Sequence, residues 1–204
     1  MEVELTAITP NAGKVIEHAA RICYQSEDHI TSESAESLLP KLLVAGHESP
    51  FEHAYATFRI AGVSRAMTHQ LVRHRLMAVS QKSQRYVGES NFEYVIPPSL
   101  PAHLKGEFEE DMETIRKMYA KWKANGLRNE DARFVLPNAC ATELMISADF
   151  REFRHIFQVR ITKHAQWEIR EACRMMLDIL YREAPVCFAD IMEEIIKAEK
   201  KSGK

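Results

Sequence analysis

The sequence predicts an α/β protein of the α+β type, in which a small, mostly antiparallel sheet is flanked by helices. Strand-like segments are few, and they do not alternate with helical segments in the βαβ rhythm of a parallel sheet. The chain has no Gly-x-Gly-x-x-Gly motif, so a Rossmann dinucleotide site is not indicated. No repeat or low-complexity linker divides the sequence. We therefore expect one domain, 1–204, with a frayed Lys-rich tail at about 197–204.

The N-terminal part of the chain is expected to supply two strands and three helices. Alternating apolar residues predict a strand at 3–9, and aromatic and β-branched residues predict another at 53–60. A first helix follows the turn at Pro10, and a second is expected from its cap, Ser34, to residue 45. Ser64 should cap a third helix leading to Arg73. Residues 80–83 lose the helical period and are expected to be irregular.

The rest of the chain is expected to be mostly helical. Residues 84–96 read as two strands joined by a turn at 88–91. A long helix is expected at 104–125, with the apolar side chains of Phe108, Met112, Ile115, Met118, Tyr119 and Trp122 in the core. Asn129 should cap a short helix, and a strand should follow at 139–147. The last three helices are expected at 150–159, at 165–183 with Trp167 inward, and after Pro185.

Composition indicates a soluble globular protein, with 46% hydrophobic and 27% charged residues. The net charge of −2 gives no global basic field, so we expect no nucleic-acid partner. No apolar run approaches the length of a membrane span, and the N-terminus is not a signal peptide, so a cytoplasmic location is expected. The cysteines lack metal-ligand spacing and should be free thiols, mostly in the core; they are Cys23, Cys140, Cys173 and Cys187.

An acid-free segment, residues 53–88, is the main functional signal. It holds six Arg or Lys residues and three His residues in an otherwise slightly acidic chain. Cations repel one another, and Arg binds phosphate bidentately, so a bound polyanion explains their convergence. A solvated basic helix face is the simpler alternative. Interspersed apolar residues such as Leu71 and Val72 favour partial burial and hence a bound anion.

Four motifs resemble those of the flavin-dependent thymidylate synthases. Arg73-His74-Arg75 is followed after seven residues by Ser83, and the other three motifs are 46–53, 132–137, and Arg160 followed by 164–170. Together they span about residues 46 to 190. The resemblance implies an unrelated flavin fold and reductive methylation of dUMP to dTMP. Methylenetetrahydrofolate would give the carbon, and FAD reduced by NADPH the hydride. It also implies a homotetramer with active sites between subunits.

The resemblance also implies roles for particular residues. Arg160 would be catalytic, because a guanidinium can stabilise negative charge at N3 and O2 of uracil. The implied dUMP contacts are Gln70, Arg73, Gln81, Ser83, Gln84, Arg85, Arg133 and Arg160. The implied FAD contacts are His47, Ser49, Arg73, His74, Arg75, Gln81, His155 and His164. Asp149 stands where some relatives carry Asn. No metal site is expected.

Alternatives remain open at several positions. Ser83 is interpreted as a hydrogen-bond donor to the substrate rather than a nucleophile, since no Asp-backed His is apparent; a turn serine is the structural alternative. Arg160 alone could be a surface residue at a helix end, and Arg133 could pair with Glu130. For the whole chain, a nucleic-acid-binding module and a non-catalytic nucleotide-binding regulator compete with the enzyme. A cysteine-dependent thymidylate synthase is disfavoured, because no cysteine lies in a cationic motif.

Overall fold

A four-stranded antiparallel sheet forms the centre of the computed structural model, which describes residues 1–202 except the side chains of Glu199 and Ser202. The strands are β1 (Glu2–Ile8), β2 (Tyr55–Ser64), β3 (Met77–Gln81) and β4 (Ala141–Asp149), in the spatial order β1-β2-β4-β3. All three neighbouring pairs are antiparallel. The predicted fold class is confirmed. Among the described residues, no helix has the length and apolar character needed to cross a membrane.

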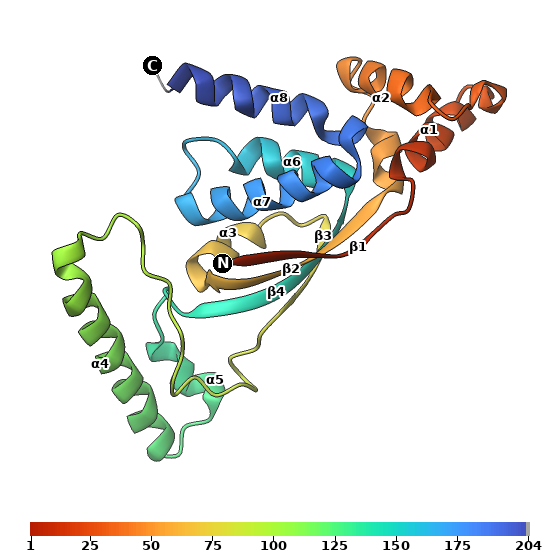
Figure 1. The fold of residues 1–204 in the computed structure, drawn as a ribbon. Helices are drawn as coiled ribbons and strands as arrows, with labels where there is room; N and C mark the ends of the chain where they lie inside the picture. Colours follow the sequence, from red (N-terminus) through yellow and green to blue (C-terminus); the bar gives the residue numbers. More distant parts are fainter. Residues whose placement is uncertain (203–204) are drawn as a thin grey trace.

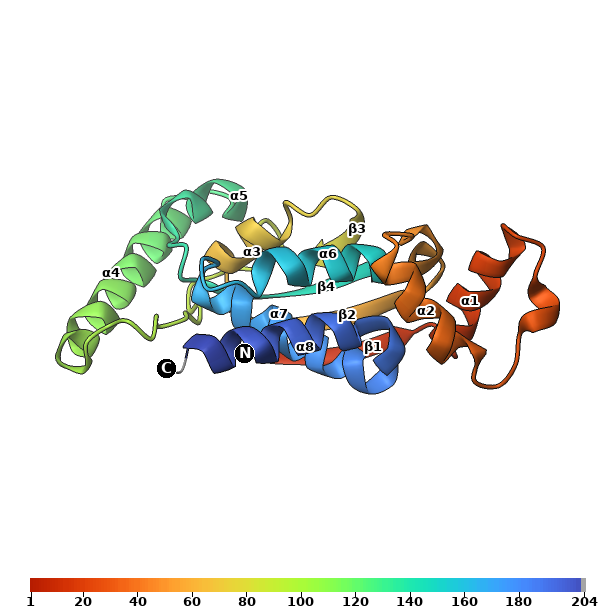
Figure 2. The same ribbon diagram turned by 90° about the horizontal axis from the view of Figure 1, so that it is seen from above.

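Eight α-helices surround this sheet in the described residues. They are α1 (Ala12–Ile22), α2 (Ser34–Val44), α3 (Arg65–Leu71), α4 (Lys105–Ala124), α5 (Asn129–Ala132), α6 (Phe150–Arg160), α7 (Trp167–Glu183) and α8 (Pro185–Ser202). Short 3-10 helices lie at Glu27–His29, Ser49–His53, Ala102–Leu104 and Arg133–Val135. Helices α6, α7 and α8 lie together over one face of the sheet, with α1 and α2 at one end and α4 and α5 at the other (Figures 1 and 2).

The main core lies between the sheet and the helices that cover it. Every second side chain of β2 and β4 is buried, as period-two alternation requires when one face of a sheet is covered. Phe58 of β2 meets Phe153 of α6 edge to face, with ring centroids 5.5 Å apart. Several of the alternate residues are polar: Thr57 and Ser147 share a hydrogen bond of 2.8 Å across the two strands. The more deeply buried face of the sheet is the one that packs against the helices.

A second, smaller core attaches α4. Phe92, Met112 and Cys140 are buried there, with Tyr94, Phe108 and Ile115 packed around them. The exposed fractions of Met118 and Trp122 are 48% and 40%, so their predicted core positions were wrong. Helix α4 lies at the edge of the molecule (Figure 1), where only one of its faces meets the rest of the chain.

Several sequence predictions about local structure were wrong. Residues 84–96 form only one isolated bridge, Tyr94 with Cys140. Their aromatic side chains pack against α4, so their strand-like composition reflects burial rather than pairing. Ser80 and Gln81 end β3 instead of lying in an irregular segment.

The predicted caps have mixed outcomes. Ser34 and Asn129 are the first residues of α2 and α5, and neither is an N-cap. Ser64 does cap α3, as predicted. Helix α8 continues through the predicted frayed segment to Ser202, and the last two residues of that segment lie outside the described part.

Candidate active site between α3 and α6

Helix α3 carries several predicted site residues, and its start is fixed by buried hydrogen bonds. The Ser64 hydroxyl oxygen accepts the Met67 N–H at 3.0 Å. The buried Glu168 carboxylate accepts hydrogen bonds from the Ser64 N–H at 2.6 Å and from the Ser64 hydroxyl at 2.5 Å. Gln166 in turn caps α7, because its side-chain oxygen accepts the N–H groups of Glu168 and Ile169. The motif at 164–170 therefore anchors the first turn of α3.

Arg160, at the C-terminal end of α6, reaches across to the end of α3. Its Nε donates to Nε2 of His74 at 2.9 Å, and its Nη2 donates to the Gln70 carbonyl oxygen at 3.2 Å. The two contacts come from residues 86 and 90 positions away in the sequence. They hold the guanidinium in a defined orientation, which a solvated surface arginine would not have.

The imidazole that receives this hydrogen bond is buried. His74 is 8% exposed, and its ring meets the His155 ring edge to face, with centroids 5.6 Å apart. Burial, and then the nearby charges of Arg160 and His155, lower the pKa of His74 to about 4. His74 is therefore neutral at physiological pH, so it adds no positive charge beside Arg160.

A second group of residues surrounds a cavity of about 280 Å³ at the other end of α3. Its lining residues are Arg65, His69, Gln84, Arg133, Phe134, Leu136, Pro137 and Asn138. Burial, followed by the charge of Arg133, lowers the pKa of Arg65. The Arg133 Nε donates to the backbone oxygen of Glu130 at 3.1 Å, not to its carboxylate, so the salt bridge considered from the sequence is not formed. Two guanidinium groups thus face one polar cavity.

Some cations of the acid-free segment have acidic partners from distant parts of the chain. Arg59 pairs with Glu143, Lys82 with Glu89, and Arg85 with Glu130. The absence of acidic residues from this segment therefore does not leave all its cations unpaired, because acidic partners lie on other elements. Within the described residues, only two of the site arginines, Arg73 and Arg75, are exposed and without an acidic partner.

Ser83 and Gln81 occupy ordinary structural positions beside these groups. The Ser83 hydroxyl oxygen accepts the Arg85 N–H at 3.2 Å, which closes a tight turn. Gln81 donates through Nε2 to the Thr68 hydroxyl at 3.0 Å and the Thr142 hydroxyl at 3.4 Å. Both residues belong to the segment that leads from β3 to Gln84 at the cavity.

Three predicted residues are not joined to this group within one chain. His47, Ser49 and His164 are exposed, and among the described residues their side chains make no hydrogen bond to the residues around Arg160. Asp149 has a structural place: its carboxylate caps α6 by accepting the Glu152 N–H at 2.7 Å.

Arg154, which precedes Arg160 by six residues on α6, has a structural role. Arg154 is buried and pairs bidentately with Asp190 of α8, so it faces the core rather than a ligand. This pairing was not visible in the sequence.

The buried cysteines are poor nucleophiles. Burial raises the pKa values of the Cys140, Cys173 and Cys187 thiols to about 12, and Cys23 is exposed. Thiols of such pKa carry almost no thiolate at neutral pH. Among the described residues, no three His, Cys, Asp or Glu side chains are grouped so as to hold a metal ion.

Comparison with known proteins decides the family. The family model described as "Thymidylate synthase complementing protein" matches residues 4–186. A flavin-dependent thymidylate synthase of Nitratidesulfovibrio vulgaris is 41% identical over an alignment that covers 92% of this chain and 85% of that protein. The chain belongs to the flavin-dependent thymidylate synthase family.

Further comparisons agree. A flavin-dependent thymidylate synthase of Clostridium tetani is 37% identical, with 92% of this chain and 85% of that protein covered. The fold matches a crystal structure of thymidylate synthase X from Helicobacter pylori with FAD and dUMP. Its TM-score is 0.80 and its identity 23%, with 93% of this chain and 98% of the other covered. Members of the flavin-dependent thymidylate synthase family are enzymes, and the family's fold is not a Rossmann fold.

The sequence analysis assigned no role to three residues that lie in or beside the candidate site. Arg65 and His69 line the cavity, and Glu152 faces His74. Arg65 and His69 are four residues apart on a helix whose cap was recognised, so a shared helix face could have been inferred. Asp149 and Glu152 have the spacing of a helix capping box, which gives no hint that Glu152 faces a histidine.

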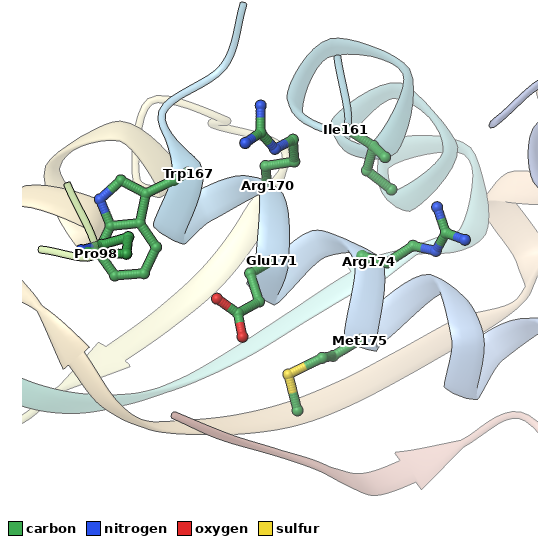
Figure 3. Close-up of a pocket in the computed structure, with 7 residues that line it drawn as sticks. All are labelled: Pro98, Ile161, Trp167, Arg170, Glu171, Arg174 and Met175. Carbon is green, nitrogen blue, oxygen red and sulfur yellow. The ribbon is translucent and has the colours of Figure 1, made fainter. Parts of the chain in front are cut away.

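A larger cavity of about 420 Å³ lies beside α7. It is lined by Pro98, Ile161, Trp167, Arg170, Glu171, Arg174 and Met175, and none of these was a predicted site residue. Figure 3 shows Trp167 next to Pro98, with Arg170 and Arg174 from α7 on the other side. Trp167 is half-buried and lines this cavity, so its predicted inward position was wrong.

Proposed function

We propose that this protein converts dUMP to dTMP, with methylenetetrahydrofolate as the carbon donor, FAD as cofactor and NADPH as reductant. The observation that carries the proposal is the orientation of Arg160 by the neutral His74 and the Gln70 carbonyl. Support also comes from relatives named flavin-dependent thymidylate synthase, and from the similarly folded Helicobacter pylori protein with FAD and dUMP.

The residues present fit a flavin dinucleotide. Arg73 and Arg75 are exposed and have no acidic partner in the described part of the chain, which suits a pyrophosphate. When bound, reduced FAD supplies a hydride for the methylation. We propose that eight residues hold it: His47, Ser49, Arg73, His74, Arg75, Gln81, His155 and His164. For His74, which is buried, the contact would be limited to its accessible ring edge.

The cavity between Arg65 and Arg133 fits the monophosphate of dUMP. Two guanidinium groups that repel each other gain from a dianion placed between them, and Gln84 offers an amide on the same wall. We propose that Gln70, Arg73, Gln81, Ser83 and Arg85 complete the nucleotide site. Arg85 would then exchange part of its contact with Glu130 for the substrate.

Arg160 is proposed to activate the uracil ring. C5 of uracil becomes nucleophilic when negative charge develops at N3 and O2, and a guanidinium aimed at these atoms stabilises that charge. The hydrogen bonds to His74 and Gln70 use two of its five N–H groups, so a planar edge remains for the substrate. Because His74 is neutral, it orients Arg160 without competing for the developing charge.

A homotetramer with composite sites is part of the same proposal. His47, Ser49 and His164 are exposed and are not joined to Arg160 within one chain. A neighbouring subunit could bring copies of these residues to the group around Arg160. That arrangement would account for flavin contacts that one chain does not gather.

The test is a visible spectrum of the purified protein with added FAD, followed by an assay of dTMP formation. Flavin absorption and dTMP formation that needs methylenetetrahydrofolate and NADPH are the expected results. Protein that stays colourless with excess FAD would refute the proposal. Binding of FAD and dUMP without dTMP formation would favour the non-catalytic nucleotide-binding regulator instead.

A further inference from the structure

A buried carboxylate behind His74 has no role in the function proposed above. Glu152 lies on α6 about two turns before Arg160, and it is 6% exposed. Its Oε1 is 3.8 Å from Nδ1 of His74, on the side of the imidazole opposite the nitrogen that meets Arg160. The Asp149 cap fixes the first turn of α6, and with it the direction of the Glu152 side chain.

The hydrogen bond from Arg160 determines where the imidazole proton lies. An arginine Nε can only donate, so Nε2 of His74 must accept with a free lone pair. The pKa of about 4 makes the ring neutral, so its single N–H proton is on Nδ1. The Glu152 Oε1 lies 3.8 Å from that nitrogen. The buried site thus places an acceptor on one side of the ring and a donor on the other.

We propose that Glu152 is a positioning residue: its carboxylate keeps the proton of His74 on Nδ1, so that Nε2 stays available to orient Arg160. Without Glu152, the neutral ring could place its proton on Nε2, where two N–H donors, those of His74 and Arg160, would oppose each other. The guanidinium would then turn away from the position that the Gln70 carbonyl and His74 now define.

The surroundings support this role. At 3.8 Å the attraction between a carboxylate and an N–H dipole is substantial only if water is excluded, and both groups are at least nine-tenths buried. Burial raises the pKa of Glu152, while the charge of His155 lowers it and that of Asp149 raises it. Arg160 and His155 are the charged groups that act on His74 itself. Glu152 is the carboxyl group that lies next to Nδ1.

The experiment observes the tautomer directly. Protein with nitrogen-15-labelled histidine gives two-bond proton–nitrogen correlations, in which protonated and unprotonated ring nitrogens have clearly different shifts. The His74 signals are identified by their loss in His74→Gln. We expect the Nδ1–H form in the wild type and in Glu152→Gln, which keeps an oxygen acceptor. In Glu152→Met, which is similar in size but has no acceptor, at least part of the population should move to Nε2–H.

Turnover is the second readout, and it rests on the proposed function. Loss of an outer partner of a metal-bound histidine costs about 10–100-fold in affinity or activity, and we expect a similar loss of dTMP formation in Glu152→Met. Glu152→Gln should recover most of the rate. The matched control is Glu17→Gln, because Glu17 is a fully buried carboxylate that bonds Arg21 and Ser34 instead. It should leave the His74 signals unchanged.

The His74 tautomer and the rate of dTMP formation together distinguish failure of this inference from failure of the proposed function. If Glu152→Met folds and keeps His74 fully in the Nδ1–H form, Glu152 does not set the tautomer and the inference is wrong. The inference is also wrong if the tautomer changes while the rate of dTMP formation stays at the wild-type value. If the wild type makes no dTMP although its His74 tautomer responds to Glu152→Met, only the proposed function fails.

Discussion

Replacing Asp190 with alanine should destabilise the fold by about 3 kcal/mol. Arg154, with 2% of its side chain exposed, donates to the two Asp190 carboxylate oxygens at 2.8 and 2.6 Å. Hydrogen bonds to charged groups contribute about 1.5–3 kcal/mol each, and an unpaired buried charge costs about 3–5 kcal/mol. The Asp190 side chain is 44% exposed, so water can reach the space it leaves. The loss of stability should therefore lie at the low end of this range of about 3–5 kcal/mol. The Cys187 carbonyl and the Phe51 ring also still contact the guanidinium.

Urea unfolding measures this loss, and a double variant tests its cause. Arg154→Met combined with Asp190→Leu removes both charges and should recover most of the stability, because apolar replacement of a buried pair is often neutral or stabilising. Glu193→Ala, which breaks the exposed Lys197–Glu193 pair, is the control and should change the unfolding free energy by less than about 0.5 kcal/mol. A loss below about 1 kcal/mol for Asp190→Ala, or a double variant as unstable as the single one, would refute this reasoning.

Three further predictions concern the site. Arg160→Ala should lower dTMP formation about 10²–10³-fold while NADPH still reduces bound FAD; normal dTMP formation would exclude the proposed role of Arg160. Mixed tetramers of an inactive Arg160 variant and an inactive His164 variant should regain activity, because His164 is exposed and is not joined to Arg160 within one chain; no recovery after verified subunit exchange would place both residues in one subunit's site. His74 titrates near pH 4 when folded and near 6.5 when unfolded, so its contribution to stability is present above 6.5 and declines as pH falls to 4. In His74→Gln, unfolding measured across this range should therefore depend less on pH, and an unchanged dependence would contradict the shifted pKa.

Local signals in the sequence were sufficient for much of the fold. The Ser64 cap, the period-two strands and the long amphipathic segments each depend on residues close together in the chain, and they were predicted correctly. The strand prediction for residues 84–96 was wrong because aromatic residues are common both in strands and in segments buried against a helix. The sequence alone does not show whether a strand or a helix packs against them.

The sequence predicted which residues belong to the candidate site, but not which contacts they make. The resemblance to flavin-dependent thymidylate synthases placed Arg160 and His74 in one site, and the structure brings them within hydrogen-bonding distance. The acidic residues that contact these and neighbouring basic side chains come from other parts of the chain. Glu152 reaches His74 from another element, and Asp190 of α8 pairs with the buried Arg154 of α6. Such pairs depend on tertiary contacts, which periodicity and spacing do not encode.

The strand order has a consequence for how the chain folds as it is synthesised. Strand β4 lies between β2 and β3, so neither earlier strand has its main partner until residues 141–149 have emerged. Between the end of β2 at Ser64 and the start of β4 lie about 80 residues, which take roughly 4–16 s to synthesise at 5–20 residues per second. During this time the basic segment and the apolar side of β2 are exposed together. Folding then requires contacts between distant residues, which is slow, so the nascent chain should depend on chaperones more than a protein built from local hairpins.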